Sequence, residues 1–395
     1  MSHTQAPSAG GSSSTVRFGT RFESLTGLRF VAAALVFMSH VGPTAYFANQ
    51  SINMNIFRIF SHAGTAAVSF FFILSGFVMT LSARPGDTPG RFIRRRFVKI
   101  FPNHLVTFVF AALLFHYAFT LSRGIPNLFL LHAWVPRVET FFSVDPVSWT
   151  LSCELLFYLS FPFIYPLLSR IRPQRLWLSA AVTVGGIVAL WVIASNVLPD
   201  NPPLSFPPLP VGLYEYWFVY IFPPVRLLEF VLGIIIARIV LSGRWIRVGM
   251  APCALLVLGA YALTDQAPAL LSLTVIMVVP LALLVGATGW TDLTGQPSIL
   301  RNRVGIWFGE ISFAFYLVHI LILAGSRFWL GRTNFFSVPQ AIGLIVLAFA
   351  ASVLASWLMY RLVERPMVRR FSNPRRRPPA NVQSGHEPER VPTTP

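Results

Sequence analysis

The sequence predicts an all-α membrane protein: a polytopic bundle of about ten transmembrane helices with both termini in the cytosol. Hydrophobic residues make up 54% of the 395-residue chain and charged residues only 11%, against about 25% charged residues in soluble domains. A net charge of +17 would also suit nucleic-acid binding. The cations, however, lie in short segments between apolar stretches. We therefore expect the protein to interact with a lipid bilayer and not with nucleic acid.

Ten apolar stretches are candidates for spans. They cover residues 25–46, 63–83, 97–120, 147–169, 176–197, 220–241, 249–264, 269–288, 305–326 and 339–362. With the N-terminus inside, 24 of the 31 lysines and arginines fall in cytosolic segments and 5 in outer loops, as the positive-inside rule requires. Eight prolines between 199 and 224 predict a loop before the sixth span. We expect a multi-pass protein of the cytoplasmic (inner) cell membrane.

Residues 22–365 are expected to form one transmembrane domain between two tails. Residues 1–21 are rich in Ser, Gly and Ala and lack the apolar core of a signal peptide, which predicts a disordered N-terminal tail. Residues 366–395 are basic and Pro-rich, which predicts a disordered C-terminal tail. The two cysteines, Cys153 and Cys253, lie in apolar stretches and offer neither a disulfide framework nor a zinc spacing. No metal site is predicted.

The first span carries two ionisable residues, Arg29 and His40. Such residues are costly inside a bilayer and indicate a functional site. Eleven residues separate them, so on a helix they share one face, roughly 16 Å apart. The alternative is structural: Arg29 extends to the interface and His40 bonds a neighbouring helix.

The densest cationic segment outside the tails is 84–99, RPGDTPGRFIRRRFVK. It includes Arg95, Arg96 and Lys99, and the last two would share a helix face. These residues anchor the topology, and guanidinium groups at this position could also bind phosphate. Arg91 and Arg94 offer the same spacing as Arg96 and Lys99, so the register stays open.

The fourth span opens with DPVSWTLSCELLFY and places Glu154 inside the bilayer. Glu154 is expected about seven residues below the outer surface, and His40 lies in the outer half of span one, so the two reach similar depths and could form a pair in which the carboxylate orients the imidazole. The alternative is a buried carboxyl that is protonated or paired with an arginine. Trp149 is a candidate substrate contact, although an interface anchor is the commoner role of tryptophan here.

Span nine reads GEISFAFYLVHILIL, and Ser312, Tyr316 and His319 form one polar stripe on it. The stripe should face the bundle interior, where these residues are candidates for substrate binding. Two further charged pairs have structural interpretations. Arg226 and Glu229 could form an ion pair within span six, and Arg361 and Glu364 an interfacial pair at the end of span ten.

Six short motifs in order resemble the acyltransferase 3 family of integral-membrane acyltransferases. They are LTGLRFVAAALVFMSH, SFFFILSGFVM, RRRFVKIFP, WTLSCELLFYLSFP, SFAFYLVH and YRLVERP, and they extend over roughly residues 24–366. The family's Arg-x-x-Arg pair corresponds best to Arg96 and Lys99, where lysine replaces the second arginine. The resemblance implies transfer of an acyl group, acetyl or longer, from acyl-CoA to a hydroxyl of a glycan, a sugar or a secondary metabolite such as a macrolide.

The resemblance assigns a role to each candidate residue. His40 would be the general base and Glu154 its orienting partner. Arg29, Arg95, Arg96 and Lys99 would bind acyl-CoA, which is a cosubstrate; no permanently bound cofactor is expected. Direct transfer and an acyl-histidine intermediate both stay open. The alternative function is a proton-coupled transporter in which His40, Glu154 and His319 form a relay.

Overall fold

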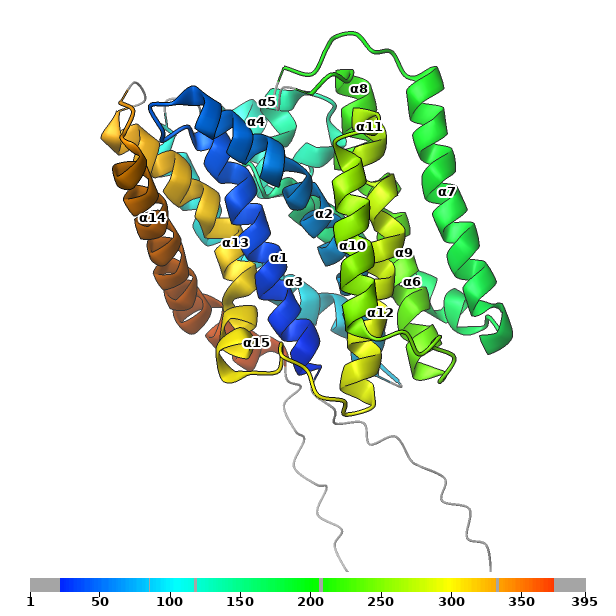
Figure 1. Ribbon diagram of the computed structural model, residues 1–395. Coiled ribbons are helices and arrows are strands. Elements are labelled where there is room, and N and C mark those ends of the chain that lie inside the picture. The colour runs from blue at the N-terminus through cyan, green and yellow to red at the C-terminus, as the bar shows by residue number, and fades with distance from the viewer. Residues whose placement is uncertain (1–21, 85, 117–118, 206–208, 332–333, 373–395) are drawn as a thin grey trace, which may run out of the picture.

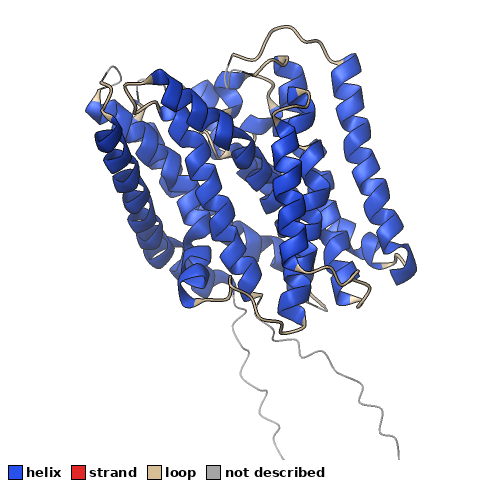
Figure 2. Cartoon of the chain, viewed as in Figure 1, coloured by secondary structure: helices blue, strands red, loops and turns tan. Residues whose placement is uncertain are grey.

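The protein is a bundle of long antiparallel helices, with shorter helices in the connections between them (Figure 1). The computed structural model describes residues 22–84, 86–116, 119–205, 209–331 and 334–372. Within these ranges no residue belongs to a β-sheet, and helices and loops alternate (Figure 2). The all-α prediction is confirmed. The predicted N-terminal tail, residues 1–21, lies outside the described residues, as do residues 373–395.

The long helices occur at all ten predicted positions. They are α1 (Glu23–Thr44), α2 (Gln50–Ser82), α3 (Pro89–Leu114), α6 (Trp149–Ser169), α7 (Leu176–Val197), α9 (Pro223–Leu241), α10 (Met250–Thr264), α12 (Val275–Leu293), α13 (Arg303–Leu330) and α14 (Val338–Met359). Eight membrane-spanning candidates meet both length and hydropathy requirements among the described helices. The helix α9 is not among the eight, and α10 has only 15 residues. The count of ten spans therefore stays a prediction.

Short elements fill the connections. They are α4 (Leu121–Leu128), η2 (His132–Trp134), α5 (Val138–Phe141), η3 (Pro173–Arg175), α8 (Leu213–Tyr216), η4 (Trp217–Ile221), α11 (Ala269–Ser272), η5 (Tyr360–Glu364) and α15 (Arg365–Ser372). The proline-rich stretch predicted as a loop thus becomes helical at Leu213. Residues 366–372, predicted to belong to the disordered C-terminal tail, are instead part of the helix α15.

Local sequence signals explain where several helices begin. Asn49 caps α2 by accepting a hydrogen bond from the backbone N–H of Ser51, and Thr88 caps α3 with Pro89 at its first position. Side chains of this type satisfy N–H groups that have no partner inside the helix. The cap at Asn49 lies 14 residues before the predicted start of span two at residue 63. The helix α2 is therefore much longer than the apolar stretch within it.

The helices α1, α2, α12 and α13 form the centre of the bundle. Close approach between them depends on glycine: a Cβ at Gly309 of α13 would lie 2.0 Å from the carbonyl oxygen of Thr26 in α1. Small residues at such crossings let backbones pack without lipid between them. The helices α7 and α14 lie at opposite edges of the bundle (Figure 1). The polar residues of α1 and α13 consequently face each other in the interior.

Candidate active site

Two chambers meet in the middle of the bundle. The large chamber encloses about 960 Å³ and extends to the end of the bundle where α1 finishes, because Thr44 and Ala45 line it. The basic chamber encloses about 110 Å³ and lies toward the end where α1 begins. Its lining includes four charged side chains: Arg29, Arg96, Lys99 and Glu154. Both linings are mostly apolar, and the large chamber also has the charged residues Arg123, Glu139 and Arg327; the basic chamber differs in holding three cations and a carboxylate in a much smaller space.

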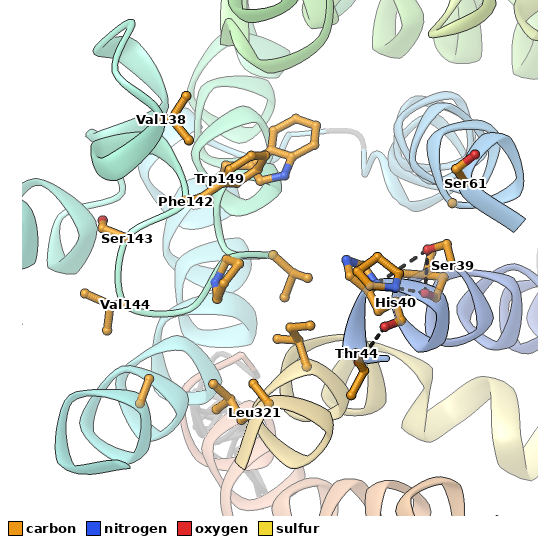
Figure 3. Close-up of a pocket in the computed structure, with 18 of the residues that line it drawn as sticks. Ser39, His40, Thr44, Ser61, Val138, Phe142, Ser143, Val144, Trp149 and Leu321 are labelled. Carbon is orange, nitrogen blue, oxygen red and sulfur yellow. Dashed lines mark hydrogen bonds between the residues drawn. The ribbon is translucent and has the colours of Figure 1, made fainter. Parts of the chain in front are cut away.

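His40 lies in the wall of the large chamber, across the cavity from Trp149 of α6 (Figure 3). Its side chain is only partly buried. The Nδ1 atom lies 2.9 Å from the carbonyl oxygen of Val36, one turn earlier in α1. No hydrogen bond of Nε2 occurs among the described residues. One edge of the ring is thus held by the protein, and Nε2 stays available to a ligand.

His319 lies directly behind His40. Its side chain is fully buried in α13, and its Nε2 atom lies 3.3 Å from Nδ1 of His40. Its own Nδ1 lies 2.7 Å from the carbonyl oxygen of Tyr316. The polar stripe on span nine does face the interior, but His319 contacts a histidine of α1 rather than either cavity. The sequence showed the stripe, and only the packing of α1 on α13 showed what it meets.

Tyr316 forms part of the wall between the two chambers, because it lines both of them. Its hydroxyl accepts a hydrogen bond from the Thr150 hydroxyl at 3.1 Å and donates to the Val147 carbonyl at 3.3 Å. Ser312, one turn earlier on α13, lines the basic chamber and donates to the Gly309 carbonyl at 2.8 Å. The stripe therefore runs from the basic chamber, along the wall, to His40.

The basic chamber brings together Arg29 of α1 with Arg96 and Lys99 of α3. The guanidinium of Arg96 lies 5.4 Å from the centre of the Phe92 ring and 6.0 Å from that of Tyr158, distances at which aromatic faces attract cations. It also donates to the Ser82 hydroxyl. The predicted register Arg96 and Lys99 reaches the chamber, whereas Arg91 and Arg94 are exposed outside it.

Arg95 has a different environment from the residues on either side of it. It donates through both terminal nitrogens to the carboxylate of Asp87, with Nη1 3.0 Å from Oδ1. This hydrogen bonding holds the pKa of Asp87 below its usual value, against the opposing effect of burial. Arg95 is not part of the basic chamber. It links the start of α3 to Asp87 in the loop between α2 and α3.

Glu154 does not pair with His40, contrary to the arrangement expected from the sequence. It accepts a hydrogen bond from Tyr158 on its own helix, and Lys99, Arg29 and Arg96 act on it electrostatically. The expectation was wrong because the start of α6, and not Glu154, lies at the level of His40: Val147 and Trp149 line the large chamber with His40, whereas Glu154 lines the basic chamber. The first turn of α6 already lies beside Tyr316 and the large chamber. One turn further along, Glu154 reaches the depth of Arg29 rather than that of His40.

Two residues near the basic chamber were not recognised as part of it from the sequence. The Tyr158 hydroxyl bonds Glu154, and their i, i+4 spacing could have indicated that contact. Glu364 accepts a hydrogen bond from Asn103 at 2.9 Å and acts electrostatically on Lys99 and Arg29. It does not form the expected pair with Arg361, whose guanidinium lies 5.4 Å from the Trp357 ring centre.

The ion pair expected in span six is present. Arg226 and Glu229 lie 3.0 Å apart on α9, both almost fully buried, and Arg226 also donates to the Ser69 hydroxyl of α2 at 3.1 Å. Both residues lie outside the two chambers. The pair therefore joins α9 to α2. The polar residues that could bind ligands are those that line the two chambers.

The fold and the site define a bundle of apolar helices, eight of them candidates for membrane spans among those described, with a histidine in one chamber beside a second chamber lined by cations. The acyltransferase domain of the acyltransferase 3 family matches residues 22–361, and the chain belongs to this family. The acyltransferase MdmB of Streptomyces mycarofaciens is 39% identical over 375 residues, which cover 92% of this chain and 95% of that protein.

A second relative is more distant. The exopolysaccharide production protein ExoZ of Rhizobium meliloti (strain 1021) is 28% identical over 323 residues, 78% of this chain and 90% of that protein. No solved structure matches the chain. The protein is therefore an acyltransferase, and family membership favours acyl transfer over the alternative of a proton-coupled transporter.

Proposed function

We propose that the protein is an O-acyltransferase that moves an acyl group from acyl-CoA to the hydroxyl of an acceptor. The proposal rests on the position of His40, which lines the large chamber, while three cations line the adjoining basic chamber. Tyr316 lines both chambers and forms part of the wall between them. Two substrates that enter from opposite ends of the bundle would meet at this wall.

The basic chamber suits the acyl donor. Three partly buried cations inside a membrane bundle are costly unless they bind an anion, and Glu154 and Glu364 offset only part of their charge. A volume of about 110 Å³ is below the roughly 300–1,000 Å³ of a pocket for a whole ligand. We therefore place the thioester-bearing arm of the donor in the chamber. Its phosphates would lie at the entrance, close to Arg96 and the exposed Arg91 and Arg94.

The large chamber suits the acceptor. Its volume of about 960 Å³ is at the upper end of ligand pockets, and its lining is largely aromatic and aliphatic, including Phe57, Phe115 and Trp149. A sugar, a glycan end or a macrolide-like secondary metabolite would fit a space of this size. The apolar lining favours an acceptor with a large apolar surface, whose hydroxyl is directed at His40.

The reaction needs one base that later acts as an acid. Nε2 of His40 takes the proton of the acceptor hydroxyl while the oxygen attacks the thioester carbonyl carbon. The carbon–sulfur bond then breaks, and the proton passes from His40 to the departing thiolate, which leaves as free CoA. General-base catalysis contributes about 10²–10⁴ in rate. Holding both substrates in place can contribute a further ~7–11 kcal/mol.

The orientation in the membrane belongs to the same proposal. The basic end of the bundle, where α1 begins and α3 begins, would face the cytosol, because cationic segments stay on that side. Acyl-CoA is a cytosolic molecule and would enter there. The large chamber would open toward the opposite face of the cytoplasmic membrane.

The test is a transfer assay with the full-length protein in lipid nanodiscs. Radiolabelled acetyl-CoA and a panel of hydroxyl acceptors are supplied, and labelled ester is measured for wild type, His40→Gln and the control His116→Gln. His116 is exposed and lines neither chamber. We expect ester formation by wild type and by the control, and a loss of about 10²-fold or more for His40→Gln. Activity of His40→Gln above about a tenth of wild type would contradict the assignment of the base.

A further inference from the structure

The contact between the two histidines assigns a role to His319. We infer that His319 is a positioning residue that accepts a hydrogen bond from Nδ1–H of His40, fixes the ring and leaves Nε2 of His40 as the basic atom. The inference rests on the proposed function of His40. It adds a residue that touches neither substrate, since His319 is fully buried and lines neither chamber.

The proton positions follow from the carbonyl partners. Nδ1 of His319 lies 2.7 Å from the carbonyl oxygen of Tyr316 and 3.2 Å from that of Phe315. A carbonyl oxygen can only accept, so Nδ1 of His319 carries the hydrogen. In the neutral ring, Nε2 then has a free lone pair. That lone pair faces Nδ1 of His40 at 3.3 Å.

The same argument applies to His40. Its Nδ1 lies 2.9 Å from the Val36 carbonyl oxygen, so this nitrogen also carries a hydrogen. The Val36 oxygen, however, already accepts from the Ser39 hydroxyl at 2.7 Å, and the regular α-helical bond of residue 40 uses it as well. An oxygen with two lone pairs cannot serve three donors well. The Nε2 atom of His319 supplies the further acceptor that Nδ1–H of His40 needs.

The surroundings explain why a neutral acceptor is used here. In the serine protease triad a carboxylate accepts from the histidine and stabilises the imidazolium ion. At this depth in a bilayer an unpaired carboxylate is costly, and Glu154 lies among the cations of the basic chamber. Among the described residues, neither ring forms a hydrogen bond or ion pair with a charged side chain, and the titratable group that each ring contacts is the other histidine. A neutral imidazole can hold the ring without burying a charge.

The pair should also stabilise the charged form of His40. When Nε2 of His40 takes a proton, its Nδ1–H becomes a charged donor, and hydrogen bonds from charged donors are roughly twice as strong as neutral ones. The benefit appears only once the proton has moved. Loss of His319 should therefore lower kcat and leave the KM values of donor and acceptor close to wild type.

Nitrogen-15 NMR of labelled histidine in the full-length protein in nanodiscs tests the proton positions directly. We expect Nδ1 of His40 to be protonated and Nε2 to be unprotonated, with His319 in the same tautomer. Replacing His319 by Phe should change the signals of His40 to those of a mixture of tautomers. A wild-type spectrum in which Nε2 of His40 carries the proton would overturn the inference, whether or not any variant folds.

The kinetic test compares two replacements of His319. His319→Phe keeps a flat ring, which can still stack on Phe315 as His319 does, and should lower kcat about 10- to 100-fold, as the loss of a supporting partner typically does. His319→Gln keeps an acceptor and should recover part of that loss. His104→Gln, a fully buried histidine outside both chambers, controls for the loss of any buried histidine.

The outcomes separate this inference from the proposed function. Equal kcat for wild type and His319→Phe would overturn the role of His319 and leave His40 as the base. Equal losses in His319→Gln and His319→Phe, with unchanged NMR signals of His40, would show a packing role only and overturn it as well. Activity retained by His40→Gln would instead contradict the proposed function itself.

Discussion

The hydroxyl of Thr150 donates to the hydroxyl of Tyr316 across a distance of 3.1 Å, and this contact joins α6 to α13 at the wall between the two chambers. Tyr316 also donates to the Val147 carbonyl. The Tyr316 hydroxyl thus accepts one hydrogen bond and donates another, and the two together fix the position of the ring. A wall fixed in this way keeps water in the large chamber away from a reactive thioester until an acceptor is bound.

Removal of the Tyr316 ring should open the wall. We expect Tyr316→Ala to release free CoA from acetyl-CoA without any acceptor, several-fold faster than wild type, because water then reaches the thioester. Tyr316→Phe is the matched control: it keeps the ring and loses only the hydroxyl, so its hydrolysis should stay close to wild type. The measurement is thiol release over time. No increase for the Ala variant would show that the wall lies elsewhere.

The charge of Glu154 should stabilise the basic chamber rather than His40. We expect Glu154→Gln to lower the melting temperature, because Arg29, Arg96 and Lys99 lose their shared carboxylate. Glu154 forms no ion pair within 4.0 Å among the described residues, so the cost should be below the about 3–5 kcal/mol of breaking a buried pair. Added acetyl-CoA should raise the melting temperature of the variant more than that of wild type, since the chamber without Glu154 is more cationic and attracts the nearby phosphates more strongly.

Kinetics check the same residue independently. If Glu154 oriented His40, Glu154→Gln would lose about 10²-fold or more in kcat. The arrangement seen here predicts a much smaller loss. Glu310→Gln serves as the control, because Glu310 is exposed and lines neither chamber. A large loss in kcat with an unchanged melting temperature would restore the pairing expected from the sequence.

Neighbouring arginines should differ in donor binding. Arg96 lines the basic chamber, whereas Arg95 pairs with Asp87 outside it. We expect Arg96→Ala to raise the KM for acetyl-CoA about 10-fold or more, the scale of one lost hydrogen bond to a charged group. Arg95→Ala should change that KM by less than about twofold. The measurement is the KM for acetyl-CoA in steady-state kinetics at saturating acceptor. Equal increases of this KM in the two variants would place the donor site closer to the loop between α2 and α3.

A pH dependence should come from Asp145, in the connection before α6. Burial raises its pKa to about 7, against hydrogen bonds from the Val147 N–H and the Thr107 side chain. A carboxyl whose pKa is raised on folding stays protonated in the folded protein after it has ionised in the unfolded chain, so stability falls as the pH rises from about 4 to about 7 and levels off above that.

Melting temperatures between about pH 5 and pH 7 test this directly. We expect wild type to lose stability over the interval and Asp145→Asn to lose less, because the amide cannot ionise and still accepts from the Val147 N–H. Parallel curves for the two proteins would show that Asp145 is not the group responsible.

The sequence by itself determined the helical bundle, the position of most helices and the shared face of Arg29 and His40. These are local properties: hydropathy and the 3.6-residue period fix which side chains of one helix lie together. The same period correctly placed Arg96 and Lys99 together and put Ser312, Tyr316 and His319 on one interior stripe.

Only the tertiary structure decided which stripes meet. It brought His319 to His40 rather than to a ligand, and it moved Glu154 from the expected partner His40 to the cations of the basic chamber. The depth and rotation of each helix depend on packing against its neighbours, such as the contact of Gly309 with α1. No single span contains that information, because the residues that set it lie on other helices.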